Sequence, residues 1–84
     1  MREIKGKMPI SVKARVWREF EACKGSDIPE VARLIGEVYG LTADEILDEV
    51  ELEDLAPLYI ECYRYIIDLY NKKLGTIPNA ESGR

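Results

Sequence analysis

The apolar residues of the first half of the chain recur every three or four positions. Residues at this spacing share one face of an α-helix, so the pattern predicts an amphipathic helix starting near residue 12. Ser11 is placed to cap its start, and Gly25 offers a left-handed stop. The apolar positions of this first predicted helix are Val12, Val16, Phe20 and Cys23, with Trp17 beside them.

A second helix is predicted between two clear boundary signals. Asp27 followed three residues later by Glu30 is a capping box, and Pro29 is tolerated in a first helical turn. Gly40 marks the end. The stripe between them consists of Ile28, Val31, Leu34, Ile35 and Val38.

Two more helices are expected after Gly40. Thr42 with Glu45 forms another capping box, which predicts a short helix over residues 43–50. Pro57 cannot lie deep inside a helix, so the last helix is expected to begin at 52–54 and to continue to Leu74, with Gly75 at its stop.

The two ends of the chain lack helical periodicity. Residues 1–10 are interpreted as an extended lead-in or short strand. Residues 76–84 are rich in small and polar residues and are predicted to be a disordered tail. The predicted fold is therefore mainly α, a small bundle of about four helices with a short extended N-terminal segment, in a single domain over residues 1–75.

The periodic positions also predict the core. A Trp17→Ala change at such a buried site would cost roughly 3–5 kcal/mol. The residues expected to be buried together are Trp17, Phe20, Leu34, Ile35, Val38, Leu47, Leu58 and Ile66.

The last predicted helix carries two apolar stripes. Only three shorter helices are available to cover it, so one stripe is expected to pack in the core and the other to bind a partner. The predicted core stripe is Leu55, Leu58, Tyr59, Cys62, Ile66 and Leu69, and Leu74 ends the other stripe. The predicted partner-binding residues, at coiled-coil-like spacing, are Ile60, Tyr63, Ile67 and Tyr70.

The net charge of −4 conceals an uneven distribution along the chain. Residues 1–24 contain seven bases and three acids, whereas residues 25–62 contain one base and eleven acids. We therefore expect the bases Lys13, Arg15 and Arg18 to meet the acidic segment 49–54, within one chain or between chains. The acidic middle also disfavours nucleic acid, whose phosphates require Lys and Arg.

The chain lacks the residues that several classes of functional site require. The chain has no His, and Cys23 and Cys62 lie far apart, so no metal or other cofactor is expected and both thiols are interpreted as buried. No nucleophile-and-base motif or phosphate-binding loop is present, which argues against an enzyme. No apolar run is long enough to span a membrane, and a cytosolic protein is expected.

Most of the chain resembles the tail assembly chaperones of long-tailed phages of Gram-positive hosts. The similar portions are the run from Val38 to Leu47, the acidic turn leading into residues 55–58, and the closing amphipathic helix. Residues 4–14 are similar to the short strand region with which that family opens, although the N-terminus is shorter than the family's two-strand opening.

The resemblance implies a partner and a compartment. A chaperone of this kind binds the tape measure protein in the cytoplasm of the host cell while the tail tube assembles, which makes the tail tube protein a second expected partner. A homo-oligomer is expected as well. The alternative is a small helical regulatory module that binds proteins, of the antitoxin or transcription-accessory type.

Overall fold

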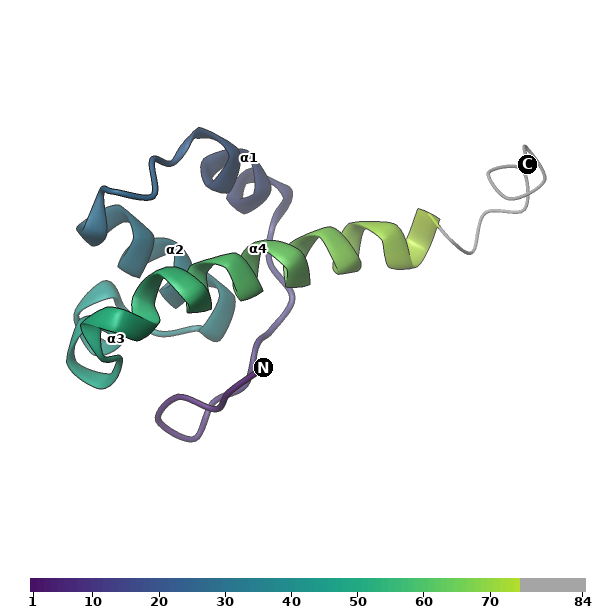
Figure 1. The fold of residues 1–84 in the computed structure, drawn as a ribbon. Coiled ribbons are helices and arrows are strands. Elements are labelled where there is room, and N and C mark those ends of the chain that lie inside the picture. The colour runs from purple at the N-terminus through teal and green to yellow at the C-terminus, as the bar shows by residue number, and fades with distance from the viewer. Residues whose placement is uncertain (75–84) are drawn as a thin grey trace.

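The computed structural model describes residues 1–74, in which four helices follow one another and no strand is present (Figure 1). They are α1 (Ala14–Ala22), α2 (Ile28–Tyr39), α3 (Ala43–Glu49) and α4 (Leu52–Leu74). The predicted mainly helical fold is confirmed. The stop at Gly75 and the tail predicted for 76–84 lie outside the described residues.

The N-terminal segment is a tight turn held against α2. Ile4 and Lys7 exchange two backbone hydrogen bonds of 2.9 and 2.8 Å around Lys5 and Gly6, both of which have positive φ. The Tyr39 hydroxyl donates to the carbonyl of Arg2 at 2.6 Å. The predicted extended segment therefore contains an isolated β-bridge between Ile4 and Lys7. A strand would need a longer stretch of chain to pair with, and this turn does not supply one.

Helix α1 begins and ends differently from the prediction. Its N-cap is Lys13, which makes no capping hydrogen bond through its side chain, so Ser11 is not the cap. It stops at Cys23, which is extended, so the chain leaves the helix before Gly25 could provide a left-handed stop. Lacking a side-chain cap at its N-terminus, α1 depends on tertiary packing for its stability.

Helices α2 and α3 begin and end close to the residues predicted. Asp27 accepts a hydrogen bond from the backbone N–H of Glu30 at 3.3 Å, and Gly40 is left-handed with a φ of 73°. The complete capping box of Thr42 and Glu45 starts α3. These local signals hold because each satisfies backbone groups that the helix ends leave free.

Helix α4 crosses the other three helices and its end projects beyond them (Figure 1). Its 23 residues correspond to about 35 Å at 1.5 Å per residue. Pro57 is the sixth residue of α4, just past the first turn, so the helix forgoes one backbone hydrogen bond there and continues through it. The N-terminal half of α4 is consequently packed against the bundle, while its C-terminal end has few neighbours.

The core contains six of the eight residues predicted for it. Trp17 and Leu47 are the exceptions, with 37% and 43% of their surfaces exposed. In each case the neighbouring position of the helix points inward, since Val16 and Ile46 are buried. The complete set of buried apolar residues is Ile4, Val16, Phe20, Val31, Ala32, Leu34, Ile35, Val38, Tyr39, Ile46, Val50, Leu55, Leu58, Cys62 and Ile66.

Candidate protein-binding surface

The four residues predicted to bind a partner lie along the outward side of α4 in different surroundings. Ile60 and Tyr70 are exposed over 51% and 72% of their surfaces. Tyr63 and Ile67 are partly buried. The row is thus interrupted at Tyr63, and the open apolar surface lies on either side of it.

The larger open surface is a groove between α1 and the C-terminal half of α4, which we call the α1–α4 groove. It has a volume of about 580 Å³ and is lined mainly by apolar side chains. Trp17 and Tyr70 both line it, and both are exposed. Its lining residues are Val12, Lys13, Ala14, Trp17, Ile66, Ile67, Leu69 and Tyr70. Because it is open, apolar and rich in aromatic surface, this groove has the character of a site for a protein segment.

Tyr63 takes part in the aromatic contacts that hold α1 against α4. Its ring stacks on Trp17 with centroids 5.4 Å apart, and its hydroxyl donates to the carboxylate of Glu21. One turn earlier, Tyr59 stacks on Phe20 at 5.0 Å and donates its hydroxyl to the Phe20 carbonyl at 3.1 Å. Since these contacts position α1 over α4, Tyr63 shapes the groove and is less available than Tyr70 to a partner.

A second, smaller apolar surface lies near the start of α4. It has a volume of about 420 Å³ and includes Ile28 and Leu52, both exposed, together with Ile60. Two acidic residues are next to it in the sequence: Asp27 precedes Ile28, and Glu53 follows Leu52. Sequence reasoning placed Ile60 beside Ile67 on one face, and the structure assigns the two residues to separate hollows.

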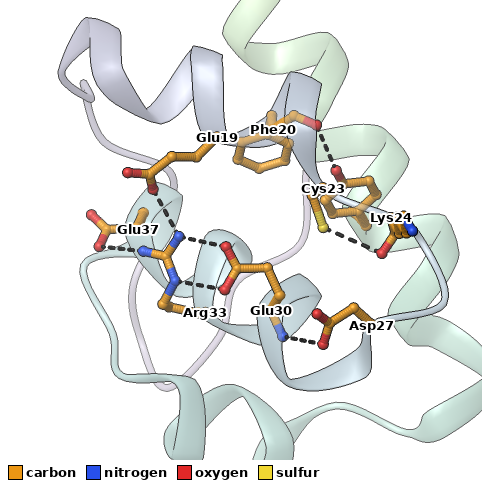
Figure 2. Close-up of polar contacts among 9 residues, drawn as sticks. Glu19, Phe20, Cys23, Lys24, Asp27, Glu30, Arg33 and Glu37 are labelled. Atoms are coloured by element: carbon orange, nitrogen blue, oxygen red, sulfur yellow. Dashed lines mark hydrogen bonds and ion pairs between the residues drawn. The ribbon is translucent and has the colours of Figure 1, made fainter.

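An ion-pair network joins α1 to α2 on the side away from the aromatic contacts. Figure 2 shows the Arg33 guanidinium among three carboxylates, at 2.7 Å from Glu19 and Glu30 and 3.6 Å from Glu37. The two hydrogen bonds from Arg33 lower the pKa of Glu30. All four side chains are partly exposed, so the network orients α1 more than it stabilises the fold.

The bases of the N-terminal region meet the acidic middle through different residues from those predicted. Arg2 lies 3.9 Å from Asp54, and Lys5 lies 3.2 Å from Glu45. Within residues 1–74, Lys13, Arg15 and Arg18 form no ion pair with residues 49–54. The N-terminal turn brings Arg2 and Lys5 to α3 and the start of α4, whereas α1 packs farther along the bundle.

The two cysteines are free thiols in different environments. Cys62 is buried in the core, as predicted, whereas Cys23 is only partly buried. Burial raises the pKa of Cys62 from near 9 to about 12, and the neighbouring Glu61 carboxylate adds to the shift. Burial likewise raises the pKa of the Tyr39 hydroxyl from 10 to about 12. Both groups therefore remain protonated in the folded protein at a pH where the unfolded chain ionises.

These two groups should make the protein sensitive to alkali. Their stabilisation is complete below about pH 9 and is lost as the pH rises towards about 12, because the unfolded state releases these protons first. Urea midpoints measured across this range should fall, and Tyr39→Phe should give a shallower fall. A wild-type midpoint that stays constant over the range would contradict the burial of both groups.

Two classes of site are not found in the described part of the chain. No three His, Cys, Asp or Glu side chains of residues 1–74 lie close enough together to hold a metal ion. None of the four described helices combines the length and apolar character needed to cross a bilayer.

No family model, curated protein or solved structure matches the chain.

Proposed function

We propose that the protein is a tail assembly chaperone of a long-tailed phage or prophage, and that it binds the tape measure protein without catalysing a reaction. The observation that carries the proposal is the α1–α4 groove, an exposed apolar surface on the longest helix of a small domain. Exposing such a surface is costly unless a partner covers it.

The shape of the groove fits a helical partner. Grooves between two helices accept the apolar face of an amphipathic helix, with side chains at helical spacing as anchors. Trp17 and Tyr70 offer large rigid rings, which are the side chains that contribute most to such interfaces. A tape measure protein is a long helical rod that is prone to aggregate, and covering its apolar face would keep it soluble until the tail tube closes around it.

The residues that carry the resemblance have structural tasks in the chain. Within the run from Val38 to Leu47, Gly40 ends α2, and Thr42 caps α3. Val38 and Ile46 are buried in the core. The resemblance therefore concerns the framework, and the binding is assigned to the groove on α1 and α4. A homo-oligomer and a second contact with the tail tube protein belong to the same proposal, as does action in the host cytoplasm.

The test is a truncation of the groove. The double change Ile67→Ala with Tyr70→Ala should weaken binding to the tape measure protein by about tenfold, since it removes a buried aliphatic and an aromatic contact. Both side chains face outward from the core, so circular dichroism should show an unchanged fold. Binding is measured by titrating the purified chain against the product of the long rod-coding gene next to its own.

The matched control removes apolar surface from the opposite end of the molecule. Leu47→Ala with Leu52→Ala truncates two exposed leucines outside the α1–α4 groove and should leave the affinity unchanged. Equal losses of affinity in the two double variants would show that the binding face is not the α1–α4 groove. Absence of a rod-coding gene beside this one, together with a toxin or operator there, would favour the regulatory alternative and overturn the proposal.

A further inference from the structure

We infer that residues 11–26, which hold α1 between two short linkers, form a lid that lifts from α2 and α4 as one unit while the rest of the domain stays folded. We call this segment the α1 lid. Its opening in the free protein goes beyond the proposed function. A second consequence, that a partner in the α1–α4 groove holds the lid shut, rests on the proposed function, because it takes the groove as the binding site.

Both ends of the α1 lid are fixed to the rest of the domain, so the segment can lift without freeing the chain on either side. Before it, the Ile10 N–H donates to the Val38 carbonyl at 2.8 Å, and the Ile10 carbonyl accepts from the Tyr65 hydroxyl at 3.1 Å. After it, Asp27 caps α2. Gly25, two residues before this cap, is exposed and can absorb the change in chain direction that lifting requires.

The α1 lid contributes little to the core. Of the fifteen buried apolar residues, two belong to it, Val16 and Phe20, and eleven of its sixteen residues are exposed. The rest of the domain contains the other buried residues. Lifting the lid therefore uncovers two buried side chains and the surface on which they pack, whereas global unfolding uncovers the whole core. Because much less apolar surface meets water, the partial opening requires much less free energy.

The polar contacts between the lid and the rest of the domain are made through side chains. Within residues 1–74, no backbone-to-backbone hydrogen bond joins residues 11–23 to α2 or α4. Exposed or partly exposed side-chain contacts of this kind each contribute little. In the described chain they are the Tyr59 hydroxyl on the Phe20 carbonyl, the Tyr63 hydroxyl on the Glu21 carboxylate, and the ion pair of Glu19 with Arg33 (Figure 2).

Lifting the lid also takes the α1–α4 groove apart. Four of the eight residues that line the groove, among them Trp17, belong to the lid, and the other four, among them Tyr70, lie on α4. A partner seated between the two helices binds the closed state alone. It therefore lowers the population of the open state, by about a hundredfold when its concentration is a hundred times its Kd.

Amide hydrogen exchange of the free chain, read by proteolysis and mass spectrometry, tests the lid. Peptides from α1 should exchange at least about tenfold faster than peptides from α2 and from residues 55–66 of α4, and all of α1 should share one weak dependence on urea. Exchange of α1 at the rate and urea dependence of α2 would overturn the inference, since α1 would then open by global unfolding alone. Fast exchange confined to the ends of α1 would overturn it as well, because that is fraying.

Two substitutions around the same guanidinium separate the attachment of the lid from the ion pairs within α2. Glu19→Gln removes the contact of α1 with Arg33 and should speed the exchange of α1 by about two- to fivefold, with α2 unchanged. Glu37→Gln makes the same change in charge, but its ion pair with Arg33 lies within α2, so the exchange of α1 should stay the same. Acceleration in neither variant, or equally in both, would contradict a lid that opens by breaking the contact between Glu19 and Arg33.

The second consequence is measured in the complex with the tape measure protein. At a hundred times Kd, the exchange of α1 should slow by about a hundredfold. Unchanged exchange, or faster exchange because the partner takes the place of α1, would overturn the coupling between lid and groove. The proposed function fails separately, if the tape measure protein does not bind or if Ile67→Ala with Tyr70→Ala leaves its affinity unchanged. The exchange of the free chain tests the lid in either case.

Discussion

Replacing Phe20 by Ala should lower the free energy of unfolding by about 3–5 kcal/mol. The Phe20 side chain is 2% exposed and stacks on Tyr59, so its removal leaves a cavity between α1 and α4 and ends an aromatic contact. A domain of this size has only a few kcal/mol of net stability, and such a loss would unfold most molecules or release α1.

Two signals distinguish release of α1 from global unfolding. Far-UV circular dichroism follows all four helices, whereas the fluorescence of Trp17, the single tryptophan, reports on α1 and its contact with Tyr63. If α1 detaches first, the fluorescence transition should precede the dichroism transition in urea. A denaturation midpoint equal to that of the wild type would show that Phe20 does not hold α1 to the core.

Trp17→Ala is the matched comparison and should cost less, about 1–2 kcal/mol, because what it removes is chiefly a stacking contact at the surface. This is smaller than the 3–5 kcal/mol expected from the sequence, and the reason is the 37% exposure of the ring. The decisive result is that Phe20→Ala lowers the free energy of unfolding more than Trp17→Ala does.

Helix boundaries could be predicted here wherever a single residue, through its side chain or its own backbone conformation, satisfies the free backbone groups of a helix end. Asp27, Gly40 and Thr42 act within three or four residues of their own positions, so a linear sequence contains the whole interaction. Ser11 failed as a cap because α1 starts at Ala14, where its packing on α4 holds it, and sequence alone does not reveal that register.

The core and the surface were harder to separate on short helices. On a helix of two or three turns, adjacent apolar residues such as Val16 and Trp17, or Ile46 and Leu47, fit a helical stripe equally well. The neighbouring helices decide which of each pair is buried. The same limit explains why the α1–α4 groove was missed, since Trp17 is one of the residues that line it and was assigned to the core. The signal that could have revealed the groove was the tryptophan next to an already complete stripe of Val12, Val16 and Phe20.

Gly36 presents a conflict between helix propensity and packing. In an exposed helix interior, replacing Gly by Ala stabilises by about 1 kcal/mol. Gly36 is buried in α2, and a Cβ there would overlap the carbonyl oxygen of Leu41 and lie 3.2 Å from its carbonyl carbon. That backbone is fixed, because the Leu41 N–H donates to the Gly36 carbonyl at 2.9 Å and Thr42 caps α3.

Gly36→Ala should therefore destabilise the protein, with a net loss of about 1–3 kcal/mol from overpacking. Gly25→Ala is the control, since a Cβ at Gly25 meets nothing within 4 Å and its φ is not positive. That change should stabilise by about 0.4–1 kcal/mol through the unfolded chain. Urea denaturation of the two single variants measures both signs at once. If Gly36→Ala raises the midpoint as Gly25→Ala does, the turn into α3 does not need the close approach to α2 that Gly36 allows.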